Sequence, residues 1–308
     1  MRHRVQKLIA LAITVAAVAG CGRSETRWLV AYVSQDQVYA EPILAQFTRE
    51  TGIAVRAVYD SEAVKTSGLV NRLLAERQHP QCDLFWNNES LRTQQLVERG
   101  LVASNGWRSV GFRSRRIIIN TKHLSRGEEP RHVADLTNSI YRGRIAIAYP
   151  VFGTTATHFL ALRQHWGHDA WIAWCRGLRA NRPLMVDGNS VVVKLVGTGE
   201  ASLGLTDSDD VAAGQREGMP VEALPLSDEL LLIPNTIALL DRAPHPLEAR
   251  QLFDFLQRKE VIETLIAAHA LEGLNDSAVA SPTLTVDLRK MVLELNAAIG
   301  ALQEIFLR

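Results

Sequence analysis

The sequence predicts an α/β protein whose strands are largely parallel. From Arg27 onward, short apolar runs typical of buried strands alternate with longer amphipathic runs of helical period. Small or polar residues follow the strand-like runs, as expected where a strand leads into a helix. The chain has 308 residues, of which 47% are hydrophobic and 22% are charged. This composition excludes a disordered chain and allows one large or two medium domains.

The first part of the chain contains three strand–helix pairs and then a strand without a helix of its own. Gly52 and Gly100 follow the first and third helices, and glycine commonly ends a helix. This order predicts parallel strands joined by helices. Strands are predicted at residues 28–33, 53–59, 83–86 and 115–120, and helices at residues 38–51, 64–78 and 89–98.

A second set of strands and helices follows. The run at 230–240 contains Pro234 and is predicted to return toward the first set. Apolar residues repeat at helical spacing from Leu288 to Phe306, which predicts a terminal helix packed on the body. Strands are predicted at residues 144–149, 201–205 and 230–240, and helices at residues 154–166, 169–178, 190–196, 211–217, 245–256, 259–268 and 288–306.

Residues 1–20 are predicted to be an export signal. Basic residues precede an apolar segment at residues 8–19, which is shorter than the roughly 20 residues of a transmembrane helix. Small residues stand directly before Cys21, and this arrangement resembles the lipobox of bacterial lipoproteins. The resemblance implies a lipid anchor on Cys21, a tether at residues 21–26, and a location in the periplasm or at the outer face of the cell membrane. An ordinary signal peptide with an incidental cysteine is the alternative.

Charge and cysteine content narrow the functions further. The net charge of +1 argues against a nucleic-acid partner, which calls for a basic surface. Besides Cys21 the chain has only Cys82 and Cys175, so no disulfide framework is expected. We predict two buried free thiols in preference to a Cys82–Cys175 bridge.

Polar and small residues at the strand ends are the candidate ligand-binding residues. In open α/β sheets, ligands bind beyond the carboxyl ends of the strands. The free N–H groups and the positive dipole end of a helix start favour a small anion there. Ordinary helix capping is the better explanation of any single position, but five such loops at strand ends in both halves together favour a ligand cleft. The candidates are Ser34, Gln35, Asp60, Ser61, Glu62, Asn87, Asn88, Gly153, Thr154, Thr155, Asn189 and Ser190.

An acidic run follows the predicted strand at 201–205. The carboxylates of Asp207, Asp209 and Asp210 are suitable ligands for a hard cation, and they are equally suited to a solvated helix start. The sequence contains no H-E-x-x-H, G-x-S-x-G, P-loop or G-x-G-x-x-G motif. We therefore predict a binding protein rather than an enzyme, without a required cofactor.

Several segments resemble the solute-binding proteins of bacterial ABC importers. Within this class the chain resembles the ferric-ion-binding branch of the type II periplasmic binding proteins. The segments that carry the resemblance are Ala31-Tyr-Val-Ser-Gln35, Ala45-Gln-Phe-Thr-Arg-Glu-Thr-Gly52, Cys82-Asp-Leu-Phe-Trp-Asn-Asn-Glu89, Arg113-Ser-Arg-Arg-Ile-Ile-Ile-Asn120 and Gly199-Glu-Ala-Ser-Leu-Gly-Leu-Thr206.

The resemblance implies two α/β lobes that close on a solute. Residues 27–120 and 230–308 are expected in lobe 1 and residues 121–229 in lobe 2, with chain crossovers near Asn120 and Leu230. A monomer that delivers its solute to the permease subunits of an ABC importer is the expected function. A sensor or scaffold lipoprotein that is not coupled to transport is the alternative.

The resemblance leaves two ligand classes open. Ferric-binding relatives carry two adjacent tyrosines where this chain has Asp209 and Asp210. One class is ferric iron with a bound anion, with Asp36, Glu89, Asp209 and Asp210 as metal ligands. The other is a small organic solute whose phosphate or carboxylate lies on the helix starts while the acids accept hydrogen bonds from its hydroxyl or amine groups. The missing tyrosines favour the second class.

Overall fold

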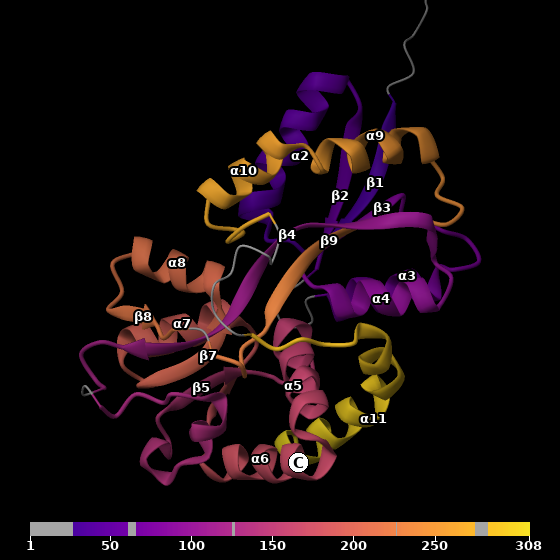
Figure 1. The fold of residues 1–308 in the computed structure, drawn as a ribbon. Coiled ribbons are helices and arrows are strands. Elements are labelled where there is room, and N and C mark those ends of the chain that lie inside the picture. The colour runs from indigo at the N-terminus through magenta and orange to yellow at the C-terminus, as the bar shows by residue number, and fades with distance from the viewer. Residues whose placement is uncertain (1–26, 61–65, 125–126, 226, 275–282) are drawn as a thin grey trace, which may run out of the picture.

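The computed structural model describes residues 27–60, 66–124, 127–225, 227–274 and 283–308 (Figure 1). The predicted signal, the tether with Cys21, and the candidates Ser61 and Glu62 lie outside these ranges. The strands are β1 Trp28–Val33, β2 Ala54–Tyr59, β3 Leu84–Asn87, β4 Val102–Asn120, β5 Ile145–Ala148, β6 Leu184–Val186, β7 Leu203–Asp207, β8 Val221–Ala223 and β9 Leu232–Leu240. The helices are α2 Gln37–Thr51, α3 Ser67–Ala75, α4 Ser90–Glu98, α5 Gly153–Trp166, α6 His168–Ala180, α7 Asn189–Thr198, α8 Ser208–Arg216, α9 Pro246–Leu256, α10 Lys259–Ala267 and α11 Leu288–Phe306, with short 3₁₀ helices at Val133–Thr137 and Ser139–Tyr141.

The described strands form a nine-stranded mixed sheet with helices on both faces, so the predicted α/β class is confirmed. Eight of the strands follow the order β2-β1-β3-β9-β4-β7-β5-β6, and β8 pairs with β4. β1 is parallel to β2 and β3, and β5 is parallel to β6 and β7, whereas β4 and β9 are antiparallel to their partners. The sequence did not predict β6 and β8, which have only three residues each.

The long strand β4 connects the two halves of the sheet. Its residues from Val102 to Ser114 pair with β9, and its residues from Arg115 to Ile119 pair with β7 (Figure 1). The change of partner therefore precedes Asn120, where the crossover was expected. The sequence predicted only the end of this strand, because two register shifts interrupt the pairing between Val102 and Phe112 and break the simple strand pattern.

The first half of the sheet contains β1, β2, β3 and β9, and its two faces bury different residues of β1. Leu29 and Val33 pack with α2, α9 and α10 on one face, whereas Tyr32 packs with α3 and α4 on the other (Figure 1). This alternation is expected because successive side chains of a strand point to opposite faces. Both faces are covered, which explains why β1 is a nearly continuous apolar run.

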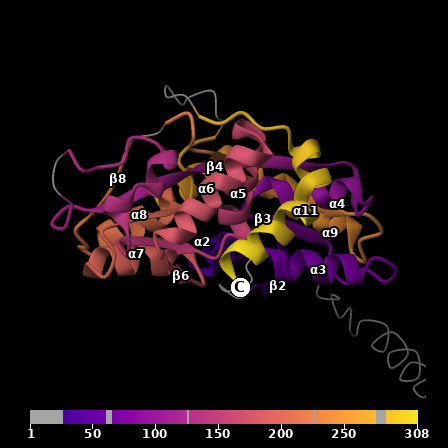
Figure 2. The same cartoon turned by 90° about the horizontal axis from the view of Figure 1, so that it is seen from below.

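The second half contains β5, β6, β7 and β8, and it has the same layered construction. Ile145 and Ile147 of β5 face α5 and α6, whereas Ala146 faces α7. The terminal helix α11 was expected in lobe 1 with the rest of residues 230–308. It packs across both halves: it contacts α4 of the first half and also joins the apolar core around α5 and α6, where the Phe306 ring lies 6.0 Å from the ring of Phe159 (Figure 2).

Both cysteines outside the signal region are free and buried, as predicted. Cys82 lies in the core of the first half and Cys175 in the core of the second half. Burial raises the pKa of both thiols well above the ordinary value, so neither thiol is a thiolate at neutral pH. No helix of the described residues combines the length and the hydropathy needed to cross a bilayer.

His158 of α5 is completely buried in the second half, and its pKa gives a test of the fold. Its Nε2 donates a hydrogen bond to the carbonyl oxygen of Glu229 at 2.7 Å. Burial and the neighbouring charge of Arg115 lower the pKa of His158 from 6.5 to about 3. The unfolded chain therefore binds a proton near pH 6.5, and the folded chain does not until about pH 3.

We expect this difference to lower the free energy of unfolding as the pH falls from 6.5 toward 3, by up to about 1.4 kcal/mol per pH unit. The variant His158→Gln keeps a donor for Glu229 and has no titrating group, so its stability is expected to decline less steeply. Urea unfolding of both proteins between about pH 7 and pH 4 measures the two slopes. Equal slopes would show that His158 titrates normally in the fold.

Candidate ligand-binding site

A small cavity of about 40 Å³ lies where the two halves of the sheet meet. Side chains from the first half, from β4 and from the second half all line it, so both halves contribute to one site. The lining residues are Thr66, Asn88, Arg113, Ala148, Tyr149, Phe152, Gly153, Thr154, Thr155, Asp187, Gly188, Asn189, Asp207 and Asp210. The cavity is therefore at the carboxyl ends of β3, β5 and β7, as predicted for an open α/β sheet.

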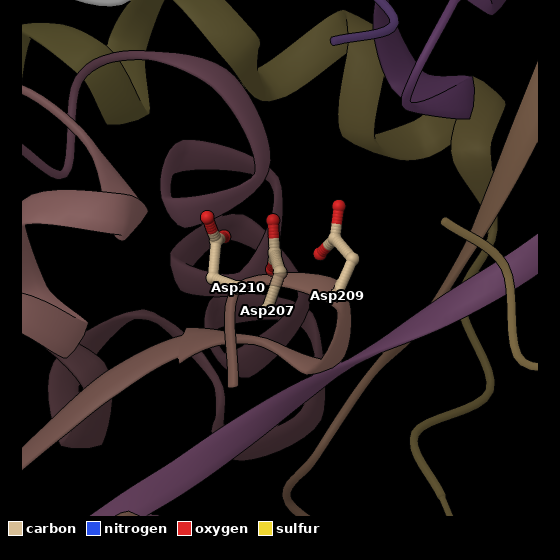
Figure 3. Close-up of side chains that lie close together, drawn as sticks. All are labelled: Asp207, Asp209 and Asp210. Carbon is tan, nitrogen blue, oxygen red and sulfur yellow. The ribbon is translucent and has the colours of Figure 1, made fainter. Parts of the chain in front are cut away.

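The acidic run forms a compact group on one side of the cavity. Each of Asp207, Asp209 and Asp210 offers a carboxylate oxygen, and the three atoms lie within 4.8 Å of one another (Figure 3). Asp207 ends β7, and the other two occupy the first turn of α8, where the helix dipole favours acidic side chains. Asp207 and Asp209 are buried, so the interpretation of this run as a solvated helix start is wrong for them.

Two buried arginines of β4 neutralise part of this acidic group. Arg113 donates one hydrogen bond to Asp209, and its Nη2 lies 3.3 Å from Oδ2 of Asp207. The Nη1 of Arg115 donates to Oδ1 of Asp207 at 2.6 Å. The exposed fractions of these two arginines are 3% and 0%. Neither arginine was predicted as a site residue, although their i, i+2 spacing on a strand was the available signal that both point to the same face.

The ion pairs favour the charged forms of Arg113 and Asp207. Burial opposes the charge on Arg113, but the nearby carboxylates of Asp209 and Asp207 raise its pKa above the ordinary value. Burial likewise opposes ionisation of Asp207, but Arg115 and Arg113 hold its pKa below the usual range. Asp36 adds to the field on Arg113, which places it within electrostatic reach across the junction of the two halves.

The starts of α5 and α7 meet at Asp207. Thr154 Oγ1 donates to Oδ2 of Asp207 at 2.7 Å, and Asn189 Nδ2 donates to the same oxygen at 2.9 Å. Neither Phe152, which precedes α5, nor Gly188, which precedes α7, caps its helix with a side chain. The structure therefore brings two helix starts without side-chain caps to the wall of one cavity, as an anion site requires.

Of the candidates in the first half that the structure describes, only Asn88 lines the cavity. Its Oδ1 accepts a hydrogen bond from Thr66 Oγ1 at 3.0 Å. Gln35 is buried and does not line the cavity. Its Oε1 accepts a hydrogen bond from Asn235 Nδ2, and Asn235 Oδ1 in turn accepts from Trp86 Nε1 at 2.8 Å. This chain of bonds connects β1, β3 and β9, so Gln35 has a structural role in the described fold.

Glu89 does not belong to the acidic group, contrary to its predicted role as a metal ligand. Its two carboxylate oxygens accept hydrogen bonds from the backbone N–H groups of Leu91 and Arg92, so Glu89 is the N-cap of α4. Thr157 also donates to it at 3.3 Å. A residue directly after a strand can therefore point into its own helix start instead of the cavity.

The other candidates are placed in three different ways. Asp60 accepts from the N–H of Leu69 at the start of α3, and Asn87 donates to Thr93 within α4. Ser34 is buried and does not line the cavity, and Ser190 is exposed beside it. Strand-end position alone therefore predicted more ligand-binding residues than the fold brings together.

The fold and the site together define a solute-binding protein, in which two halves of a sheet surround one polar cavity. Residues 29–269 match the family of bacterial extracellular solute-binding proteins. This match spans most of the chain, so the protein belongs to that family. Membership confirms the predicted class and the prediction of a binding protein rather than an enzyme.

The chain is also similar to individual proteins of known name. It is 25% identical over 300 residues to the major ferric iron-binding protein of Neisseria gonorrhoeae, covering 89% of this chain and 87% of that protein. Its fold is similar to iron-bound HitA from Pseudomonas aeruginosa, with a TM-score of 0.80 and 18% identity over 91% of this chain and 99% of that chain. It is also similar to AfuA from Actinobacillus pleuropneumoniae with fructose-6-phosphate bound, with a TM-score of 0.77 and 21% identity over 92% and 99% of the two chains.

The network around Asp207 predicts unequal effects for two conservative substitutions. Asp207→Asn removes the charge that faces Arg115 and Arg113. A buried charge left without its partner lowers the free energy of unfolding by about 3–5 kcal/mol. Asp210→Asn changes a half-buried residue of the same group and is expected to cost about 1 kcal/mol or less. Chemical denaturation of the two variants measures both losses. Similar losses in the two variants would contradict a special role for Asp207.

Proposed function

We propose that this chain is the lipid-anchored solute-binding protein of an ABC importer and that it captures a small solute bearing a phosphate or carboxylate. The family membership supports extracytoplasmic solute binding. The sequence around Cys21 supports the lipid anchor. Delivery to permease subunits follows from the proposed transport function, and the binding step needs no cofactor.

The observation that supports an anionic ligand is that the starts of α5 and α7 meet at the cavity. Gly153, Thr154 and Thr155 at one helix start, and Gly188 and Asn189 at the other, line the same small space. Backbone N–H groups at both starts lack side-chain caps, and the Thr155 hydroxyl and Arg113 add further donors. A phosphate or carboxylate is the group that satisfies several such donors at once.

Ferric iron with a bound anion is the second candidate ligand. The three carboxylate oxygens within 4.8 Å of one another favour it, because hard cations prefer oxygen ligands. The name of the relative from Neisseria gonorrhoeae also favours it.

A sensor or scaffold lipoprotein is the remaining alternative. An adjacent histidine kinase gene would favour the sensor, whereas adjacent permease and ATPase genes would favour import.

The ligand proposal predicts binding of a phosphate-bearing solute in the absence of iron. Calorimetric titration of metal-free protein with fructose-6-phosphate and with inorganic phosphate tests it, and ferric citrate tests the second candidate. We expect Thr155→Val to weaken phosphate binding by roughly tenfold, because it removes a hydroxyl donor that lines the cavity at the start of α5 and makes a long bond of 3.5 Å to Asn189. Thr198→Val, at the exposed far end of α7, is the matched control and should bind as the wild type does.

Transport further predicts that the bound protein is more compact than the free protein. Small-angle scattering with and without the titrated ligand measures this change. Binding that leaves the scattering profile unchanged would favour the sensor or scaffold alternative. Binding of ferric citrate with no response to either phosphate compound would favour iron.

The anchor proposal predicts that Cys21→Ser changes where the protein is found. Acylation at Cys21 would hold the full-length protein in the membrane fraction, because lipid chains add buried apolar surface. The serine variant should therefore appear in the soluble extracytoplasmic fraction or retain its signal. Detergent phase partitioning of both proteins measures the difference. Equal partitioning of the two would indicate that residues 1–20 are an ordinary signal peptide.

A further inference from the structure

Arg113 occupies an unusual position among the residues of the proposed site. It is only 3% exposed, it lines the cavity, and it lies against two of the three clustered carboxylates. Its Nε is buried and has no hydrogen-bond partner among the described residues. The two ion pairs use one nitrogen each, so the carboxylates do not take up all five N–H groups of the guanidinium.

We propose that Arg113 is a built-in cation that takes the place of a metal ion, so that the site binds its anion directly and without metal. The inference rests on the proposed function and deepens it, because it restricts the ligand to metal-free phosphate- or carboxylate-bearing solutes. The positive charge that a bound cation would supply next to the anion is already supplied by the chain.

The ion pairs of Arg113 explain why a metal is excluded. A cation coordinated by Asp207 and Asp209 would lie next to the guanidinium of Arg113, because Arg113 contacts both carboxylates. Two positive charges would then share the same two buried carboxylates, which is unfavourable. Arg115 cannot relieve this conflict, since it is itself completely buried and bound to Asp207.

The same contacts orient the guanidinium toward an anion. Two of its nitrogens are held by carboxylates, while Arg113 lines the cavity together with Thr154 and Thr155 at the start of α5. An anion in this space therefore meets a fixed guanidinium and a helix start together, which is the arrangement that favours charge-assisted hydrogen bonds. The carboxylates keep Arg113 charged and in place without occupying all of its donors.

The experiment compares Arg113→Gln with a matched control on the same strand. Arg116→Gln removes an arginine of β4 that pairs with Glu272 and does not line the cavity. Each protein is freed of metal with a chelator and titrated separately with inorganic phosphate by calorimetry and with Tb³⁺ by luminescence. Tb³⁺ serves as a hard trivalent probe with the oxygen preference expected of ferric iron.

We expect the wild type and Arg116→Gln to bind phosphate without metal and to bind Tb³⁺ weakly. Arg113→Gln should lose phosphate affinity by roughly tenfold or more and gain Tb³⁺ affinity by roughly tenfold or more, because it frees the carboxylates. Arg113→Lys keeps the charge and should keep the low Tb³⁺ affinity. This variant also serves if the glutamine variant fails to fold.

Two results would overturn the inference. One is equal Tb³⁺ affinity in the wild type and in Arg113→Gln. Tight Tb³⁺ binding by the wild type or by Arg113→Lys would overturn it in the same way. The other is phosphate binding by the wild type only when Tb³⁺ or ferric iron is present. Failure of phosphate binding under every condition would instead count against the proposed ligand class, while the Tb³⁺ comparison would still test the role of Arg113.

Discussion

The structure depends on one buried network of opposite charges, in which Arg113 and Arg115 of β4 meet Asp207 and Asp209 at the end of β7. Burying any one of these groups alone would be costly, and the network is stable because each charge has an opposite charge in contact. Asp207 also accepts hydrogen bonds from the starts of α5 and α7. The same carboxylate thus organises the ion pairs and the helix starts that make the cavity polar.

The sequence predicted the fold class and most of the elements because their signals are local. Buried parallel strands appear as apolar runs, and helices appear as amphipathic runs that end at glycines such as Gly52. Two short strands and the first part of β4 were missed because they lack such local signals. A strand of three residues or one with register shifts has no local pattern, and only its pairing with distant residues defines it.

The site was predictable only in part, because its composition depends on side-chain direction. Strand-end position selected Thr154, Thr155 and Asn189, which line the cavity, and the three aspartates of the acidic run lie close together. Position does not say whether a carboxylate points into the cavity or caps its own helix, and Glu89 does the latter. The ion-pair partners of the cluster lie more than ninety residues away along the chain, as for Arg113 and Asp209, so proximity in sequence gave no sign of them.

The change of partner within β4 also has a mechanical consequence. Arg113 pairs with Ile233 of β9 in one half of the sheet, and Arg115 pairs with Asp207 of β7 in the other. Both guanidinium groups nevertheless contact the same carboxylate, that of Asp207. The ion pairs therefore tie the end of β7 to β4 on both sides of the point where the partner strand changes.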